Sequence, residues 1–116
     1  MSQHKIYAMS FSNLYSCYSN KLAKKYRTSD ELKQVIFWLT GYDTKVLQKK
    51  LDQNVSVEEF FSSAPKMNPK RKKITETICG VRIEEIKEPL MQEIRYLDKL
   101  VDELAGGKPL SVVLRY

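Results

Sequence analysis

The feature that most constrains the fold of this chain is a stripe of apolar residues near its C-terminal end. Between Glu88 and Gly107, the sequence EPLMQEIRYLDKLVDELAGG repeats apolar residues at steps of four, three, four and three. This spacing predicts an α-helix that carries all of them on one narrow face. Pro89 suits the first turn of that helix, and the pair Gly106-Gly107 favours its end. The stripe residues are Leu90, Ile94, Leu97, Val101 and Leu104.

A helix with this pattern needs neighbours. Burial of the stripe stabilises it by on the order of 10 kcal/mol, at ~1.5–3 kcal/mol for each side chain. Ordering the backbone of the same segment costs more than that, at ~1–2 kcal/mol per residue. The sequence allows two partners for the stripe: the other helices of the same chain, which it favours, or a second copy of the chain. In the second case the stripe is a homodimer interface.

Helix caps recur along the first half of the chain. Ser10 is placed to cap a first helix, Thr28 a second, Asp43 a third and Ser56 a fourth, because Ser, Thr and Asp are favoured N-cap residues. The second helix also has the Glu of a capping box three residues after Thr28, and Gly41 is placed to end it in the left-handed conformation. These signals predict helices over roughly 11–27, 29–40, 44–52 and 57–64.

The second of these helices is expected to be central, since Phe37 and Trp38 widen its apolar face beyond one stripe. The third helix is expected to turn three apolar side chains inward, namely Val46, Leu47 and Leu51.

The part of the chain between the fourth helix and the C-terminal one is harder to assign. Asn68-Pro69 has the pattern of a cap followed by Pro at the first helical position, which predicts a helix to about Cys79, where Gly80 interrupts it. Segment 81–86 fits a strand and a helix equally, and 109–116 fits a short helix or an extended tail. The fold class predicted is all-α: one domain over 1–116, a compact bundle of five or six helices, with room for a short extended segment near 81–86.

The charge of the chain is positive and unevenly distributed. The formal net charge is +6, and the run KMNPKRKK at 66–73 holds five cations and no acid. If a helix begins at Asn68-Pro69, cations crowd its first turn, where the free N–H groups already make the end positive. Free N–H groups and cations together favour a phosphate group. The predicted anion-binding residues are Lys70, Arg71, Lys72 and Lys73, and the alternative is a solvated basic loop.

A second basic region lies in the predicted helix pair Asp30–Asp52. Two short helices joined by Gly41-Tyr42-Asp43 fit a helix–turn–helix, although an ordinary helix corner has the same pattern. If the pair is a helix–turn–helix, its second helix enters a DNA groove, where the lysines contact phosphates and Gln48 contacts a base edge. The groove-facing residues would be Thr44, Lys45, Gln48, Lys49 and Lys50, of which Lys45, Lys49 and Lys50 are second-line anion contacts.

A resemblance to a known family covers nearly the whole chain. It rests on four segments, KIYAMSF (5–11), WLTGYD (38–43), FF-x3-P-x2-NP-x-R (60–71) and CGVRIEEIKEPLMQEIRYLDKLVDELAGGK (79–108). Together they resemble a prokaryotic family described as domain of unknown function 2200. The resemblance implies a compact, single-domain bacterial protein of the cytoplasm, and it implies no activity and no catalytic or binding residues.

The residues that carry enzyme chemistry are sparse. The only histidine is His4, and the cysteines Cys17 and Cys79 lack metal-ligand spacing. Arg82 could activate the Cys79 thiol, but a buried, inert thiol fits the sequence better. No catalytic residue, metal or cofactor is therefore predicted.

The sequence favours a non-enzymatic binding module of the cytoplasm for an anionic partner, nucleic acid or a phosphate-bearing ligand. The alternative is a protein–protein or homodimerisation module that uses the apolar stripe. No membrane partner is expected, since no window approaches the ~18 apolar residues of a membrane span.

Overall fold

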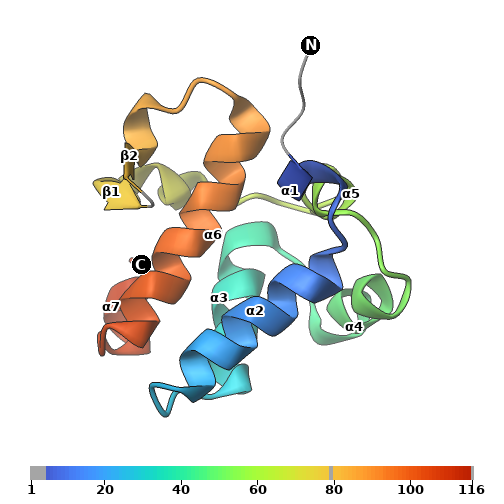
Figure 1. Ribbon diagram of the computed structural model, residues 1–116, viewed down its shortest axis with the longest axis horizontal. Coiled ribbons are helices and arrows are strands. Elements are labelled where there is room, and N and C mark those ends of the chain that lie inside the picture. Colours follow the sequence, from blue (N-terminus) through green and yellow to red (C-terminus); the bar gives the residue numbers. More distant parts are fainter. Residues whose placement is uncertain (1–4, 79, 116) are drawn as a thin grey trace.

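Helix α6 (Pro89–Ala105) is the longest element and runs diagonally past the other helices (Figure 1). The structure is a computed structural model that describes residues 5–78 and 80–115. The other α-helices are α1 (Lys5–Ala8), α2 (Phe11–Ala23), α3 (Ser29–Thr40), α4 (Thr44–Asp52), α5 (Val57–Ser62) and α7 (Leu110–Val113). Of these, α2, α3, α5 and α7 pack against α6. The predicted all-α fold is confirmed.

The helix caps explain why these elements begin where they do. The side chains of Ser10, Thr28, Asp43 and Ser56 each accept a hydrogen bond from a backbone N–H in the first turn of α2, α3, α4 and α5. At α3 the capping box is complete, because the Glu31 carboxylate also accepts from the Thr28 backbone N–H at 3.1 Å. The four helices start at the residues that the sequence predicted.

The apolar stripe of α6 is buried inside the chain. Ile94, Leu97, Val101 and Leu104 are completely inaccessible to solvent, whereas Leu90 is partly exposed. In the structure, the stripe is therefore covered by helices of the same chain, which is the first of its two predicted partners. A seam with a second copy through these side chains would require α6 to separate from α2 and α3.

An aromatic cluster joins α2, α5 and the turn between α3 and α4. The rings of Phe11 and Phe60 stack with centroids 3.6 Å apart, and the Tyr42 ring lies 4.6 Å from that of Phe60. The Tyr42 hydroxyl donates a hydrogen bond of 2.6 Å to the Phe60 carbonyl oxygen. This cluster fixes the corner at which α3 ends and α4 begins.

The predicted helix from Asn68-Pro69 to Cys79 is wrong. A short 3₁₀-helix, η1 (Pro69–Lys73), is followed by extended backbone and the strand β1 (Thr77–Ile78). The cap and the proline were interpreted correctly, because the Asn68 side chain accepts from the Lys70 N–H at 2.9 Å. The helix stops because the β-branched residues that follow disfavour it and favour extended backbone: Ile74, Thr75, Thr77 and Ile78.

Segment 81–86 contains both of its predicted alternatives. The strand β2 (Val81–Arg82) pairs antiparallel with β1, and the 3₁₀-helix η2 (Ile83–Glu85) follows directly. In the register of this hairpin, Thr77 lies opposite Arg82 and Ile78 opposite Val81. Gly80, at a φ of 78°, lies in the turn. Residue 79 lies outside the described residues, so the alternatives for the Cys79 thiol have no structural counterpart here.

The shorter helices α1, α4 and α7 differ in part from what the sequence predicts. Leu47 is buried and Leu51 packs partly buried against the core, as predicted, whereas Val46 is 36% exposed and not inward, because only one narrow side of α4 contacts the core. The one-turn helix α1 was not predicted, whereas the C-terminal segment forms the short helix α7, one of its two alternatives.

Among the described residues, no helix has both the length and the apolar composition needed to cross a membrane.

Candidate anion-binding site

The candidate site is built where α3 ends and the basic segment 66–73 begins. The last carbonyl groups of a helix have no partner within the helix. At the end of α3, the Thr40 oxygen accepts from the Lys66 N–H at 3.0 Å, and the Leu39 oxygen accepts from the Asn68 N–H at 2.9 Å. These two bonds attach the start of the basic segment to the end of the helix.

Gly41 allows this close approach. It has a φ of 79°, in the left-handed region where a side chain is strained. A Cβ atom at this position would also lie 2.9 Å from the Lys66 carbonyl oxygen. The glycine is therefore required both to end α3 and to let segment 66–69 pass beside it.

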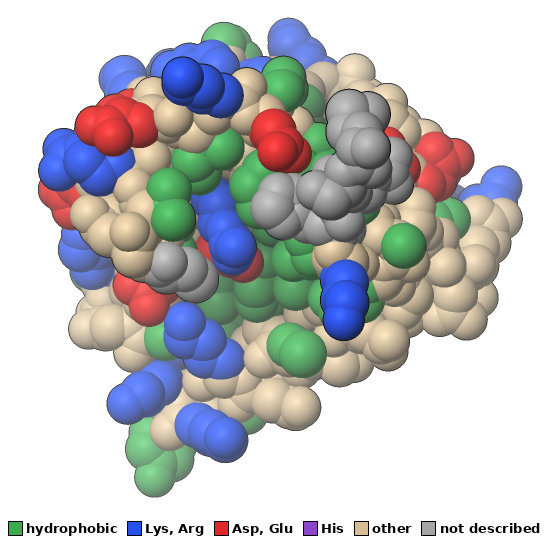
Figure 2. Space-filling model, turned by 45° about the horizontal axis from the view of Figure 1, so that its top comes forward, with side chains coloured by type: hydrophobic (Ala, Val, Ile, Leu, Met, Phe, Trp, Pro, Cys, Tyr) green, Lys and Arg blue, Asp and Glu red, His purple; other side chains and the backbone are tan. Residues whose placement is uncertain are grey.

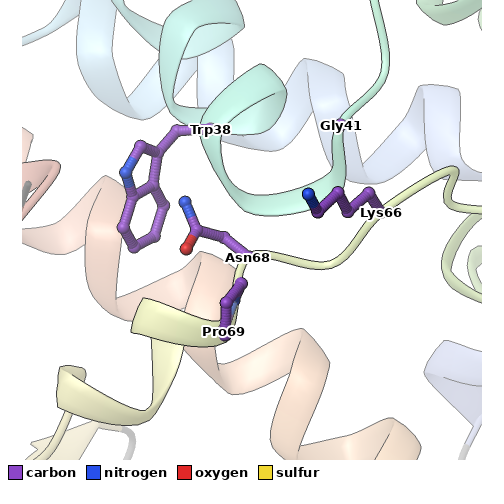
Figure 3. Close-up of a pocket in the computed structure, with 5 residues that line it drawn as sticks. All are labelled: Trp38, Gly41, Lys66, Asn68 and Pro69. Atoms are coloured by element: carbon purple, nitrogen blue, oxygen red, sulfur yellow. The ribbon is translucent and has the colours of Figure 1, made fainter.

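The two segments enclose a pocket of about 300 Å³, lined by Trp38, Gly41, Lys66, Asn68 and Pro69 (Figure 3). Figure 3 shows the Asn68 amide pointing toward the Trp38 ring, and the Lys66 side chain extending toward both from beside Gly41. The Trp38 side chain is half-buried. Its Nε1 atom is buried and makes no hydrogen bond to any described residue. The pocket thus combines an aromatic ring, an amide and an ammonium group.

The basic segment that follows the pocket divides into two kinds of cation. Lys70, Lys72 and Lys73 are exposed and form no ion pair with the described residues. Arg71 is different, since its Nε lies 3.0 Å from Oε1 of Glu93 on α6 and its Nη1 donates to the Asn68 carbonyl at 2.9 Å. The four neighbours predicted to bind an anion are therefore three exposed lysines without an ion pair to a described residue and one arginine that the fold already uses. Among the lysines, Lys72 has its Nζ over the Tyr96 ring, 6.0 Å from the ring centroid.

The other arginines of the described residues are paired in the same way as Arg71. Each of them forms an ion pair with at least one carboxylate within the described residues. The pairs are Arg27 with Glu31, Arg71 with Glu93, Arg82 with Glu84 and Glu85, Arg95 with Asp98, and Arg115 with Glu103. The positive charge that remains available to a partner is carried by lysine.

The second-line contacts lie on α4. Thr44, Lys45 and Lys49 are exposed and Lys50 is half-buried. Gln48, the residue predicted to face a base edge, donates from Nε2 to Asp52 at 2.9 Å. In Figure 1, α4 and the segment 69–73 lie on different sides of the molecule. The structure does not bring the two predicted groups of lysines into one patch.

The space-filling view shows how charge is distributed on one face of the molecule. On the face shown in Figure 2, Lys and Arg side chains are distributed around the surface with Asp and Glu side chains among them. On this face (Figure 2), positive and negative side chains are therefore intermixed.

A second pocket, of about 330 Å³, lies between the hairpin and the start of α6. Of its charged lining residues, Glu88 and Arg95 are bound within the protein, whereas Lys87 is exposed and forms no ion pair with a described residue. The Tyr7 hydroxyl donates to Glu88 at 2.6 Å, and burial together with the Glu88 carboxylate raises the pKa of Tyr7 to about 12. Arg95 donates to Asp98 at 2.6 Å, and Tyr18 donates to the same carboxylate. The two cations here, Lys87 and Arg95, are matched by the carboxylates of Glu88 and Asp98, so the pocket offers no excess positive charge.

Sequence reasoning missed the contribution of Trp38 and Lys66 to the site. The sequence places Trp38 on the apolar face of α3 and Lys66 in the basic run, and it indicates no shared role for the two. The residues are far apart in sequence, and no local pattern indicates that the end of α3 and segment 66–69 pair through their backbones. His4 lies outside the described residues.

Comparison with known proteins identifies the family. The sequence model of DUF2200, a family described as an uncharacterized protein conserved in bacteria, matches residues 5–115. The chain belongs to the DUF2200 family. A solved structure with the same fold is the crystal structure of uncharacterized protein SP1917, which is 49% identical to this DUF2200 chain and superposes with a TM-score of 0.92. The match covers 98% of this chain and 93% of the other. No curated protein matches the chain.

Proposed function

We propose that this protein is a non-enzymatic module that binds nucleic acid through its phosphate groups. The observation that carries the proposal is the contrast between the paired arginines and the unpaired lysines beside the Trp38 pocket. Lys66, Lys70, Lys72 and Lys73 follow one another along segment 66–73, and all four are exposed. Lysine binds phosphate as a compact point charge, and neutralising phosphates releases the counterions of the nucleic acid.

The same contrast argues for binding that does not depend on base sequence in a duplex. The commonest specific contact in the major groove is an arginine that makes two hydrogen bonds to guanine. In this chain the arginines are held by carboxylates, and Gln48 on α4 is held by Asp52. The cations that remain are the lysines without an ion pair, and these contact the phosphate backbone of the nucleic acid.

Helix α4 has a secondary role in the proposal. Lys45, Lys49 and Lys50 form no ion pair with a described residue, so they can add phosphate contacts at a distance from the main segment. We place the protein in the cytoplasm, which is consistent with the free thiol of Cys17 on the surface of α2.

The proposal is tested by fluorescence anisotropy of labelled single-stranded and double-stranded nucleic acid over a series of salt concentrations. The test variant is Lys66→Gln/Lys70→Gln/Lys72→Gln/Lys73→Gln, which leaves Arg71 in place because that residue pairs with Glu93. The control variant removes the same charge elsewhere, at exposed lysines without an ion pair to a described residue: Lys5, Lys24, Lys25 and Lys87.

We expect the wild-type protein to bind, and its affinity to fall steeply with salt. Each phosphate contact that is lost lowers the slope of log K against log salt by about 0.7–0.9 in magnitude. The test variant should therefore show a clearly flatter slope than the control variant. No binding at low salt, or equal weakening in both variants, would contradict the proposal.

A further inference from the structure

We infer that the Trp38 pocket receives an unpaired nucleobase, so that the nucleic acid bound by this protein is single-stranded. The inference rests on the proposed function. It adds the class of nucleic acid that is bound, a single strand, and the group that the protein recognises on it, an unpaired base. In a duplex both faces of each base are covered by its neighbours, whereas in a single strand a base can turn out and stack on an aromatic ring. Such stacking is sequence-tolerant, because every base has a π-face.

The dimensions and the lining of the pocket fit one base. Its volume of about 300 Å³ lies at the lower end of the range for small-ligand pockets, about 300–1,000 Å³. One wall is the half-buried indole ring of Trp38, and Pro69 provides a second apolar surface. A flat, partly apolar group of the size of a base can therefore lie against the ring.

Polar groups converge on the same space. The Oδ1 atom of Asn68 is engaged by the Lys70 N–H, which leaves its amide NH₂ group to donate to a ligand. This amide points toward the Trp38 ring in Figure 3. Base edges carry several acceptor atoms, so one donor beside the ring can meet any of the bases without selecting strongly among them.

The charges lie where the backbone of a single strand would pass. Lys66 lines the pocket itself, and Lys70, Lys72 and Lys73 follow directly after Pro69. In the inferred complex, a phosphate attached to the bound nucleotide would contact Lys66, and phosphates further along the strand would contact the other lysines. An aromatic ring beside a row of cations is the arrangement that proteins use for single strands.

The chain contains one tryptophan, so tryptophan fluorescence, excited at a wavelength that its tyrosines do not absorb, reports on Trp38 alone. The experiment compares the binding of three ligands to the wild-type protein: an oligothymidylate, an abasic chain of the same length and charge, and a duplex of that length. Binding is followed by anisotropy of a label on each ligand, and stacking by quenching of the tryptophan fluorescence. The variant Trp38→Leu, which keeps apolar volume without a ring, and the variant Trp38→Phe, which keeps a ring, are measured by anisotropy.

The expected result is that oligothymidylate quenches the fluorescence and binds on the order of ten-fold more tightly than the abasic chain and the duplex. In Trp38→Leu that advantage should be lost, and in Trp38→Phe it should be largely kept. Equal affinity for oligothymidylate and the abasic chain, without quenching, would overturn the inference and leave the proposed phosphate binding intact. Preference for the duplex would likewise overturn the inference alone. Absence of binding by every ligand at low salt would overturn both. The comparison of ligands uses the wild-type protein, so it stays decisive even if a Trp38 variant fails to fold.

Discussion

Arg71 and Glu93 form an ion pair, 3.0 Å from Nε to Oε1, that ties the basic segment to the central helix α6. Both side chains are largely buried, with 19% and 16% of their surface exposed. The other oxygen of Glu93 is buried without a hydrogen bond to a described residue. Arg71 thus holds the segment in place, while the lysines around it remain available for a partner.

Removal of the guanidinium in Arg71→Gln should therefore reduce the stability of the fold. The substitution leaves the Glu93 carboxylate without its countercharge, which costs about 2–3 kcal/mol for a partly buried pair. Urea unfolding followed by circular dichroism measures the free energy of unfolding. The control is Lys70→Gln, which removes an exposed charge and should change it by less than about 0.5 kcal/mol. Equal stability of the two variants would show that the ion pair contributes nothing.

Substitution of Gly41 by alanine should destabilise the protein through two effects. The left-handed backbone costs alanine about 1–2 kcal/mol, and the added Cβ atom would lie 2.9 Å from the Lys66 carbonyl oxygen. Gly107→Ala is the matched control, because Gly107 also has a positive φ, 100°, but has no atom within 4 Å of the added Cβ among the described residues. Thermal unfolding should show a larger loss for Gly41→Ala. A loss no greater than that of Gly107→Ala would mean that segment 66–69 moves aside at no cost.

Alkaline pH should destabilise the aromatic corner at Tyr42. Burial, with a smaller contribution from Glu59, raises the pKa of Tyr42 from 10.0 to about 12. Below pH 10 the phenol is protonated in both the folded and the unfolded chain, so the stability does not change with pH through this group. Between about pH 10 and pH 12 the unfolded chain ionises first, and up to about 2–3 kcal/mol of stability is lost.

The variant Tyr42→Phe separates this effect from other alkaline titrations. It leaves the Phe60 carbonyl without the hydrogen bond of 2.6 Å, which should lower the stability at neutral pH by about 1–2 kcal/mol. It should also make the decline above pH 10 shallower than in the wild type. Urea unfolding at a series of pH values measures both quantities, and parallel declines in the two proteins would contradict the assignment to Tyr42.

Truncation of a side chain in the α6 stripe should lower the free energy of unfolding of the chain. Leu97→Ala opens a cavity at a fully buried site and should cost about 2–5 kcal/mol. Val46→Ala truncates a side chain that is 36% exposed on α4, and should cost less than about 1 kcal/mol. The stability of Leu97→Ala should not depend on protein concentration, because the stripe packs within one chain. A midpoint of unfolding that rises with concentration would instead indicate a second copy on this face.

Local patterns predicted most of the helical part of the fold. The caps at Ser10, Thr28, Asp43 and Ser56 act on backbone groups within three residues, so a short window of sequence contains all the partners involved. The same windows fail at 74–78, where the cap at Asn68-Pro69 forms as predicted but the β-branched residues after it favour extended backbone over a continued helix. Val46 was misplaced for a different reason, since the number of faces that α4 buries depends on its neighbours.

The sequence alone determined where the helices begin, which stripe of α6 must be covered, and that residues 66–73 carry an excess of positive charge. Only the tertiary structure decided what covers the stripe, which cation of that run is bound by an acid, and that Trp38 lies beside Lys66 and Asn68. The physical reason is distance along the chain. Caps and periodicity depend on neighbours a few residues apart, whereas the Arg71–Glu93 pair and the backbone bonds from Lys66 and Asn68 to α3 join residues more than twenty apart. Such contacts form only when the whole core packs, and no short pattern encodes them.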